Sequence, residues 1–199
     1  MFQNGVLALT RFAIFCAWAT LLGGCAASEK SVEADEAAIQ ATLDEYLPRL
    51  AEAYALGDLE GLKAYAAENP IFDPGMLDLL ARHGGAEATS LRERLDRVLS
   101  GYAAEKEIAV MEKRISDLLD ESRVIRPSPK SVLLEDVRIF NYANAFVTSL
   151  ETWDLRVYAA GTDTVLSEAL DQRNRVKYQM KRRDDGWLVL YRVLETTFE

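Results

Sequence analysis

Apolar residues in the first half of the chain recur at helical spacing. Over residues 33–56 they fall at steps of three and four, which predicts an amphipathic helix. Pro48 should kink this helix, and Gly57 should end it. Asp58 is a typical cap for a second helix over residues 59–68. The chain therefore begins its folded part with two consecutive helices.

Three further helical segments are predicted before residue 125. Asp73 and Pro74 suit the start of a short helix, and Ser90 with Glu93 forms a capping box at the start of a longer one. After Gly101 the apolar positions move to the opposite side of the helix, by about half a turn at roughly 100° per residue. We therefore favour a break near Gly101 over one helix that is covered on both sides.

The second half of the chain has the alternation of β-strands. The segment Arg126–Lys130, with its two prolines, marks the change from helix to sheet. Strands are predicted at 132–140, 145–158, 174–183 and 187–196. Residues 159–172 should form a long connection with a helical turn, and Asp185 with Gly186 predicts a hairpin. The last strand is apolar on both faces, which predicts that it is either central in the sheet or covered on both faces.

Helices over residues 33–125 followed by a sheet over 131–197 predict one α+β domain. Three segments of this domain resemble the nuclear transport factor 2-like (SnoaL-like) superfamily: Tyr54–Glu60, Glu151–Trp153 and Tyr178–Trp187. The resemblance implies N-terminal helices packed into the concave face of a curved antiparallel sheet, which together form a cone with a pocket. It also implies that a homodimer could form through the convex face of the sheet.

The first residues have the parts of a secretory signal. Arg11 precedes an apolar run over residues 12–22, which is too short to span a bilayer. The segment Leu22–Cys25 resembles the lipobox of bacterial lipoproteins, which implies cleavage between Gly24 and Cys25 and acylation of Cys25, palmitate included. We expect a signal peptide over 1–24 and a lipidated tether over 25–32. The alternative is an ordinary secreted protein with an incidental cysteine.

The anchor implied by this resemblance sets the expected location. Such a protein is attached to the cell membrane by its lipid, with its domain in the cell envelope. Ala26 follows the cysteine, and in the resembled family this favours an outer membrane, facing the periplasm, where the organism has one.

Composition excludes several functions. The chain has 32 acidic and 23 basic residues, a net charge of −9, which argues against a nucleic-acid partner because that affinity depends on neutralising phosphates. Cleavage before Cys25 would discard Cys16, so no thiol would remain for catalysis. His83 is the only histidine, and we expect it to bond the carbonyls at a helix end. No motif predicts a metal or a cofactor.

Glu151 is the best candidate for chemistry. Alternation along its strand places it on one face with Trp153, next to apolar residues. Together with Tyr178 and Trp187 it would line the pocket of the cone. A buried carboxylate can act as a general acid or base, as in some members of the resembled superfamily. We favour a plainer role, an edge position or an ion pair with Arg175 or Lys177, and therefore assign no catalytic residue.

The function expected from these observations is non-enzymatic binding. The domain would bind a small apolar molecule or an envelope protein while anchored at a membrane. The alternative is a small-molecule hydrolase or isomerase that uses Glu151. The basic residues Arg173, Arg175, Lys177, Lys181, Arg182 and Arg183 form either a solvated sheet face or a docking patch for an acidic partner.

Overall fold

The computed structural model describes residues 32–68, 82 and 90–198. It divides into two units, Met1–Ala38 and Ile39–Glu199, and the fold described below is that of the second. The predicted signal segment with Gly24 and Cys25, the short helix from Asp73 and the single histidine His83 lie outside the described residues. None of the helices in the described ranges has the length and apolarity that crossing a bilayer requires.

The N-terminal helix of the second unit covers residues 39–55 and runs through Pro48 without interruption. A 3-10 turn, η1 (Leu56–Asp58), follows it, and α2 spans Leu59–Glu68, as predicted. At Gly57 an added Cβ would lie 2.3 Å from Cγ2 of Ile115. The turn can therefore approach α5 (Glu105–Asp120) this closely only because this position has no side chain.

The predicted break at Gly101 is confirmed. Helix α4 (Leu91–Leu99) begins with the capping box of Ser90 and Glu93 and ends before Gly101, whose φ of +83° suits glycine. Helix α5 then starts at Glu105. Each helix can therefore turn its own apolar side toward the core, which explains why the apolar positions change sides along this part of the sequence.

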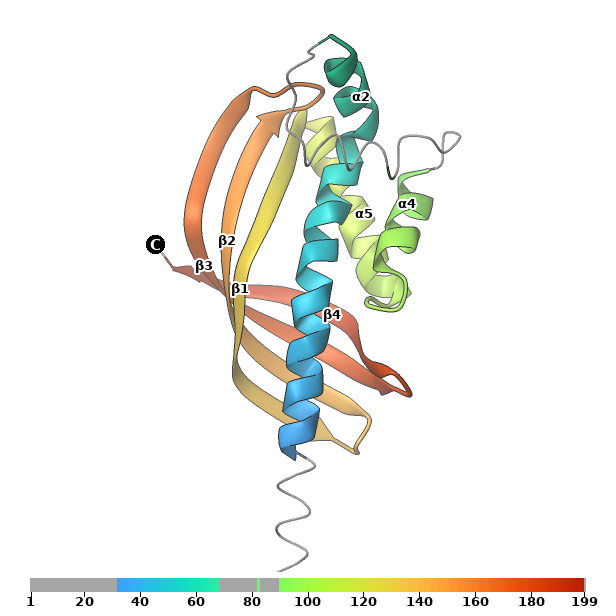
Figure 1. The fold of residues 1–199 in the computed structure, drawn as a ribbon, viewed down its shortest axis with the longest axis vertical. Coiled ribbons are helices and arrows are strands. Elements are labelled where there is room, and N and C mark those ends of the chain that lie inside the picture. The colour runs from blue at the N-terminus through green and yellow to red at the C-terminus, as the bar shows by residue number, and fades with distance from the viewer. Residues whose placement is uncertain (1–31, 69–81, 83–89, 199) are drawn as a thin grey trace, which may run out of the picture. The chain divides into compact units, whose positions relative to one another are not determined.

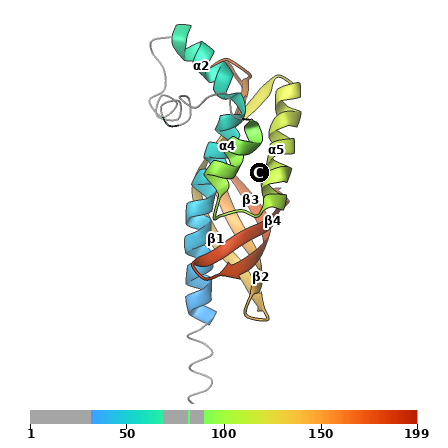
Figure 2. The same cartoon turned by 90° about the vertical axis from the view of Figure 1, so that its right-hand side faces the viewer.

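Four long strands form one antiparallel sheet in the order β1-β2-β3-β4 (Figure 1). They are β1 (Arg123–Phe140), β2 (Asn144–Ala159), β3 (Val165–Arg183) and β4 (Gly186–Phe198). Each strand pairs with the next one in the chain, and Arg183 faces Gly186 across the predicted hairpin. Helices pack against the curved sheet (Figure 2), so the predicted α+β class with helices on a curved antiparallel sheet is confirmed.

Two strand boundaries differ from the prediction. Strand β1 begins at Arg123, eight residues before the predicted start of the sheet at 131, and includes Pro127 and Pro129. Prolines are tolerated there because β1 is an edge strand with no ladder on its outer side. The predicted helical turn within 159–172 is also wrong, since β3 already begins at Val165.

Of the two predicted positions for β4, the central one is wrong, because β4 lies at the other edge of the sheet, while coverage of both faces is found at its start. Trp187, Leu188 and Val189 are nevertheless buried in succession at its start. The loop between α4 and α5 covers this stretch: the Val189 amide donates to the Tyr102 carbonyl at 2.9 Å, and the Ala104 amide donates to the Val189 carbonyl at 2.8 Å. The loop thus covers the edge where the sequence is apolar on both faces.

Candidate functional site

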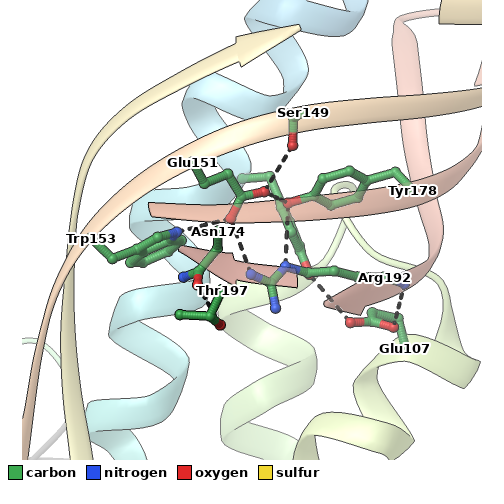
Figure 3. A network of polar contacts seen from close by, with 9 residues as sticks. Glu107, Ser149, Glu151, Trp153, Asn174, Tyr178, Arg192 and Thr197 are labelled. Atoms are coloured by element: carbon green, nitrogen blue, oxygen red, sulfur yellow. Dashed lines mark hydrogen bonds and ion pairs between the residues drawn. The ribbon is translucent and has the colours of Figure 1, made fainter. Parts of the chain in front are cut away.

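A buried carboxylate lies at the centre of the concave side of the sheet. Glu151 on β2 has no exposed surface. Its Oε1 accepts hydrogen bonds from Ser149 Oγ at 3.1 Å and from the Tyr178 hydroxyl. Its Oε2 accepts from Trp153 Nε1 at 2.8 Å and from Arg192 Nη2 at 3.0 Å (Figure 3). Three strands therefore contribute to one polar cluster, which we call the Glu151 network.

This network leaves the carboxylate of Glu151 saturated. A carboxylate has about four lone-pair positions, and four donors bind here, two on each oxygen. A general base must accept a proton from its substrate, which requires a free lone pair within hydrogen-bond reach of that substrate. In this arrangement the carboxylate holds its neighbours in place, and it has no accessible position from which to abstract a proton.

Arg192 on β4 connects the network to helix α5. Its guanidinium binds Glu151, and its Nε donates to the Tyr178 hydroxyl at 3.3 Å. Its backbone amide donates to Oε2 of Glu107 at 3.2 Å, while the Tyr46 hydroxyl reaches Oε1 of Glu107 at 3.5 Å. Only 12% of the Arg192 side chain is exposed, so this ion pair is largely shielded from water.

Burial changes the proton affinities of the groups around Arg192. It raises the pKa of the Tyr178 hydroxyl well above its usual value, and the positive charge of Arg192 only partly offsets the effect. Burial likewise raises the pKa of Glu107, against the opposing influence of Arg192, Arg114 and Tyr46. The tyrosine is therefore a hydrogen-bond donor at neutral pH, and Glu107 favours its protonated form more than an exposed glutamate does.

A cavity of about 300 Å³ adjoins the network between the helices and the sheet. Its apolar wall comes from Leu50, Tyr54, Ile125, Pro127, Trp153, Leu155 and Leu194, and its polar positions are Arg114, Gln172, Asn174, Arg192 and Thr197. Small-molecule sites are typically apolar clefts of roughly 300–1,000 Å³ with a few convergent polar groups. The cavity has this composition and lies at the lower end of that size range.

The predicted site residues are only partly brought together. Glu151, Trp153 and Tyr178 meet in the network, and Trp153 also lines the cavity. Trp187 is buried at the start of β4, where the Arg182 guanidinium lies 5.0 Å from its ring, and it does not line the cavity. Of the four predicted pocket residues, only Trp153 lines this cavity, since Glu151 and Tyr178 also lie outside its lining, and the predicted pocket stays a prediction.

The predicted ion-pair partners of Glu151 are also wrong. Arg175 lies on the other face of β3 and binds Glu135 at 2.7 Å, while Lys177 binds Glu195. The true partner is Arg192, which the sequence analysis missed because its strand reads as an apolar run. The role of Glu107 was missed for a similar reason, since it lies in an ordinary amphipathic helix.

The described residues offer no metal site. No group of three or more histidine, cysteine, aspartate or glutamate side chains gathers within them in a way that could hold an ion.

Comparison with known proteins adds little to this geometry. No protein-family model matches the chain, and no curated protein sequence matches it. Among solved structures, the intermembrane space region of the chloroplast protein ARC6 is similar, with 9% identity, a TM-score of 0.40, and coverage of 52% of this chain and 76% of that one. A periplasmic fragment of TraM has 15% identity, a TM-score of 0.39, and coverage of 52% and 80%.

A third solved structure is a protein of unknown function with a cystatin-like fold from Nostoc punctiforme. It has 14% identity and a TM-score of 0.30, and the match covers 52% of this chain and 76% of that one. At these TM-scores and identities, none of the three similarities carries an argument about function.

Proposed function

We propose that this chain is a non-enzymatic binding module of the cell envelope that takes a small, largely apolar ligand in the cavity beside Glu151. The observation that carries the proposal is the cavity itself, which has an apolar wall and few polar positions. The saturated carboxylate of Glu151 supports binding over the alternative of a hydrolase or isomerase, because it has no free lone pair for acid–base chemistry.

The proposed location rests on the first residues of the sequence. The segment Leu22–Cys25 resembles a lipobox, and we propose that Cys25 carries the lipid that anchors the domain at a membrane. Incorporation of labelled palmitate in cells tests this directly. The wild-type chain should be labelled and Cys25→Ala should not, whereas equal labelling of both, or of neither, would contradict the anchor.

Membership of the nuclear transport factor 2-like superfamily is part of the same proposal. Support comes from the segments Tyr54–Glu60, Glu151–Trp153 and Tyr178–Trp187 and from helices packed on a curved antiparallel sheet. A homodimer through the convex face is a further prediction from that resemblance, and the native mass of the protein tests it.

Native mass spectrometry on residues 26–199 tests the binding function. This fragment contains every helix and strand of the compact unit Ile39–Glu199. A gently purified sample should carry a small adduct that denaturation removes, and the adduct's mass would begin to identify the ligand. A protein that is bare after purification, and that binds no apolar molecule from an extract of its host, would refute a small-molecule function.

A further inference from the structure

The charges around the cavity are unbalanced. Two arginines, Arg114 on α5 and Arg192 on β4, contribute to its lining, and none of the described lining residues is acidic. Glu151 neutralises Arg192 from behind the lining. Arg114, by contrast, forms no ion pair with any described residue. Glu107 lies close enough to Arg114 to interact with it electrostatically, but it does not line the cavity, so the lining itself is positive although the chain as a whole is acidic.

Hydrogen-bond donors remain available on the polar side of the cavity. Within the described residues, Arg192 uses Nε for Tyr178 and Nη2 for Glu151, and its Nη1 has no partner. Asn174 accepts from the Thr197 hydroxyl at 3.0 Å through Oδ1, and its amide donors likewise have no partner among these residues. Figure 3 shows Asn174 and Thr197 together, between Trp153 and Arg192. A ligand group placed here would meet donors.

The Glu151 network holds these donors in a fixed position. Two of the three guanidinium nitrogens of Arg192 are hydrogen-bonded, which keeps the third from rotating away. An arginine held in this way loses little conformational entropy when it binds an anion, so its hydrogen bond to a ligand is stronger than that of a mobile surface arginine.

The geometry points to a specific class of ligand: a small amphiphile with one carboxylate, whose head binds Arg192 Nη1 and Asn174 and whose apolar body lies along Leu50, Trp153 and Leu155. Arg114 supplies the positive charge that Glu151 does not cancel. A single negative head complements this positive lining. This inference rests on the proposed binding function and specifies its ligand.

Octanoate and octanol test the inference, because they share one apolar chain and differ in the charged head. Binding of each to residues 26–199 is measured by isothermal titration calorimetry at pH 8. Octanoate should bind roughly ten-fold more tightly than octanol or better, which is the effect of a charge-assisted hydrogen bond in a shielded site. The difference should shrink as sodium chloride is raised, since salt screens the exposed Arg114.

Two matched variants on α5 test whether Arg114 contributes to the preference for octanoate. Arg114→Gln should weaken octanoate about three-fold and leave octanol unchanged, as expected for an exposed charge. Lys113→Gln removes the same charge one residue away, from a lysine that pairs with Asp117 and does not line the cavity, and it should change neither affinity. Arg192 is kept intact, because its removal would leave Glu151 buried without its counter-charge.

Each outcome separates this inference from the broader proposal. Equal affinities for octanoate and octanol would overturn the anionic head and leave the apolar binding site standing. A preference for octanoate that Arg114→Gln does not reduce would overturn the role given to Arg114. If neither compound binds and native mass spectrometry finds no adduct, the small-molecule binding function fails together with the inference.

Discussion

Replacing Glu151 with glutamine would isolate the charge at the centre of the network. The amide keeps the size and shape of the carboxylate. Its oxygen can still accept from Trp153 and Arg192, while its NH2 group faces the Ser149 and Tyr178 hydroxyls, which can turn to accept. The hydrogen bonds can therefore be re-formed, and the loss that remains is the negative charge opposite the guanidinium.

The cost of this loss follows from burial. Glu151 is 0% exposed and the Arg192 side chain 12%, so water cannot replace the missing partner. Breaking a buried ion pair by removing one partner typically costs about 3–5 kcal/mol. Because the hydrogen bonds of Glu151→Gln are retained, we expect a cost near the lower end, about 3 kcal/mol. For a unit of this size that corresponds to a fall in Tm of roughly 6–12 °C.

Thermal and urea unfolding of residues 26–199, followed by circular dichroism, would measure this cost. The matched control is Glu135→Gln, which makes the same change in a carboxylate that also binds an arginine, Arg175, on the outer face of the sheet. The side chain of Glu135 is 27% exposed and that of Arg175 is 41% exposed. An exposed pair of this kind contributes about 0–1 kcal/mol. The double variant Glu151→Gln with Arg192→Gln should cost less than the sum of the two single changes.

A small effect of Glu151→Gln on stability would contradict this account of the network. If Glu151→Gln costs less than about 1 kcal/mol and matches Glu135→Gln, the charge of Glu151 is not needed to hold Arg192, and the network is not the rigid support that the ligand proposal requires. A non-additivity near zero in the double-variant cycle would lead to the same conclusion.

Two further predictions concern the close contact between Gly61 and Gly161 and the protonation of Glu107. In Gly61→Ala the new Cβ would lie 2.5 Å from Gly161 Cα and 2.3 Å from Asp58 Oδ1, so the 2.7 Å hydrogen bond from the Gly161 amide to Asp58 should break. We expect the free energy of unfolding to fall by about 1–3 kcal/mol and hydrogen exchange at the Gly161 amide to become faster. A rise in stability of about 1 kcal/mol, which is typical of glycine-to-alanine changes in helices, would contradict the close contact. Burial raises the pKa of Glu107 above its ordinary 4.5, so the stability that its protonated form contributes is complete below pH 4.5 and is lost as pH rises through the raised pKa. Glu107→Gln should lack this loss, because glutamine does not titrate. If the difference in unfolding free energy between the variant and the wild type stays constant with pH, the raised pKa of Glu107 is contradicted.

Much of the fold could be predicted because local chemistry determines it. The capping box at Ser90, the change of side at Gly101 and the hairpin at Gly186 each depend on residues close together in the chain, and the structure confirms all three. The errors arose where distant segments decide. Pro127 is acceptable only because β1 has no outer neighbour, and Leu188 can be buried at a sheet edge only because a loop some 85 residues earlier covers it.

The candidate site was predictable only along one strand. Alternation placed Glu151 and Trp153 on the same face, since parity within a strand can be read from the sequence. The partners on other strands depend on register, which local sequence does not reveal: Tyr178 faces Arg192, and two register shifts lie between β3 and β4. Arg192 was missed for that reason and because its strand reads as an apolar run, together with the donors that it presents to the cavity.

The order of the strands has a consequence for how the domain folds. Every strand pairs with its neighbour in the chain, so the sheet can grow hairpin by hairpin, each step closing only a short loop. The contact between Glu107 and Arg192 joins residues 85 apart, and that between Tyr46 and Glu107 joins residues 61 apart. These contacts close long loops at a larger entropic cost, whereas α5 also packs on β1, which follows it directly in the chain. We therefore expect the contacts that complete the cavity to form after the hairpins of the sheet.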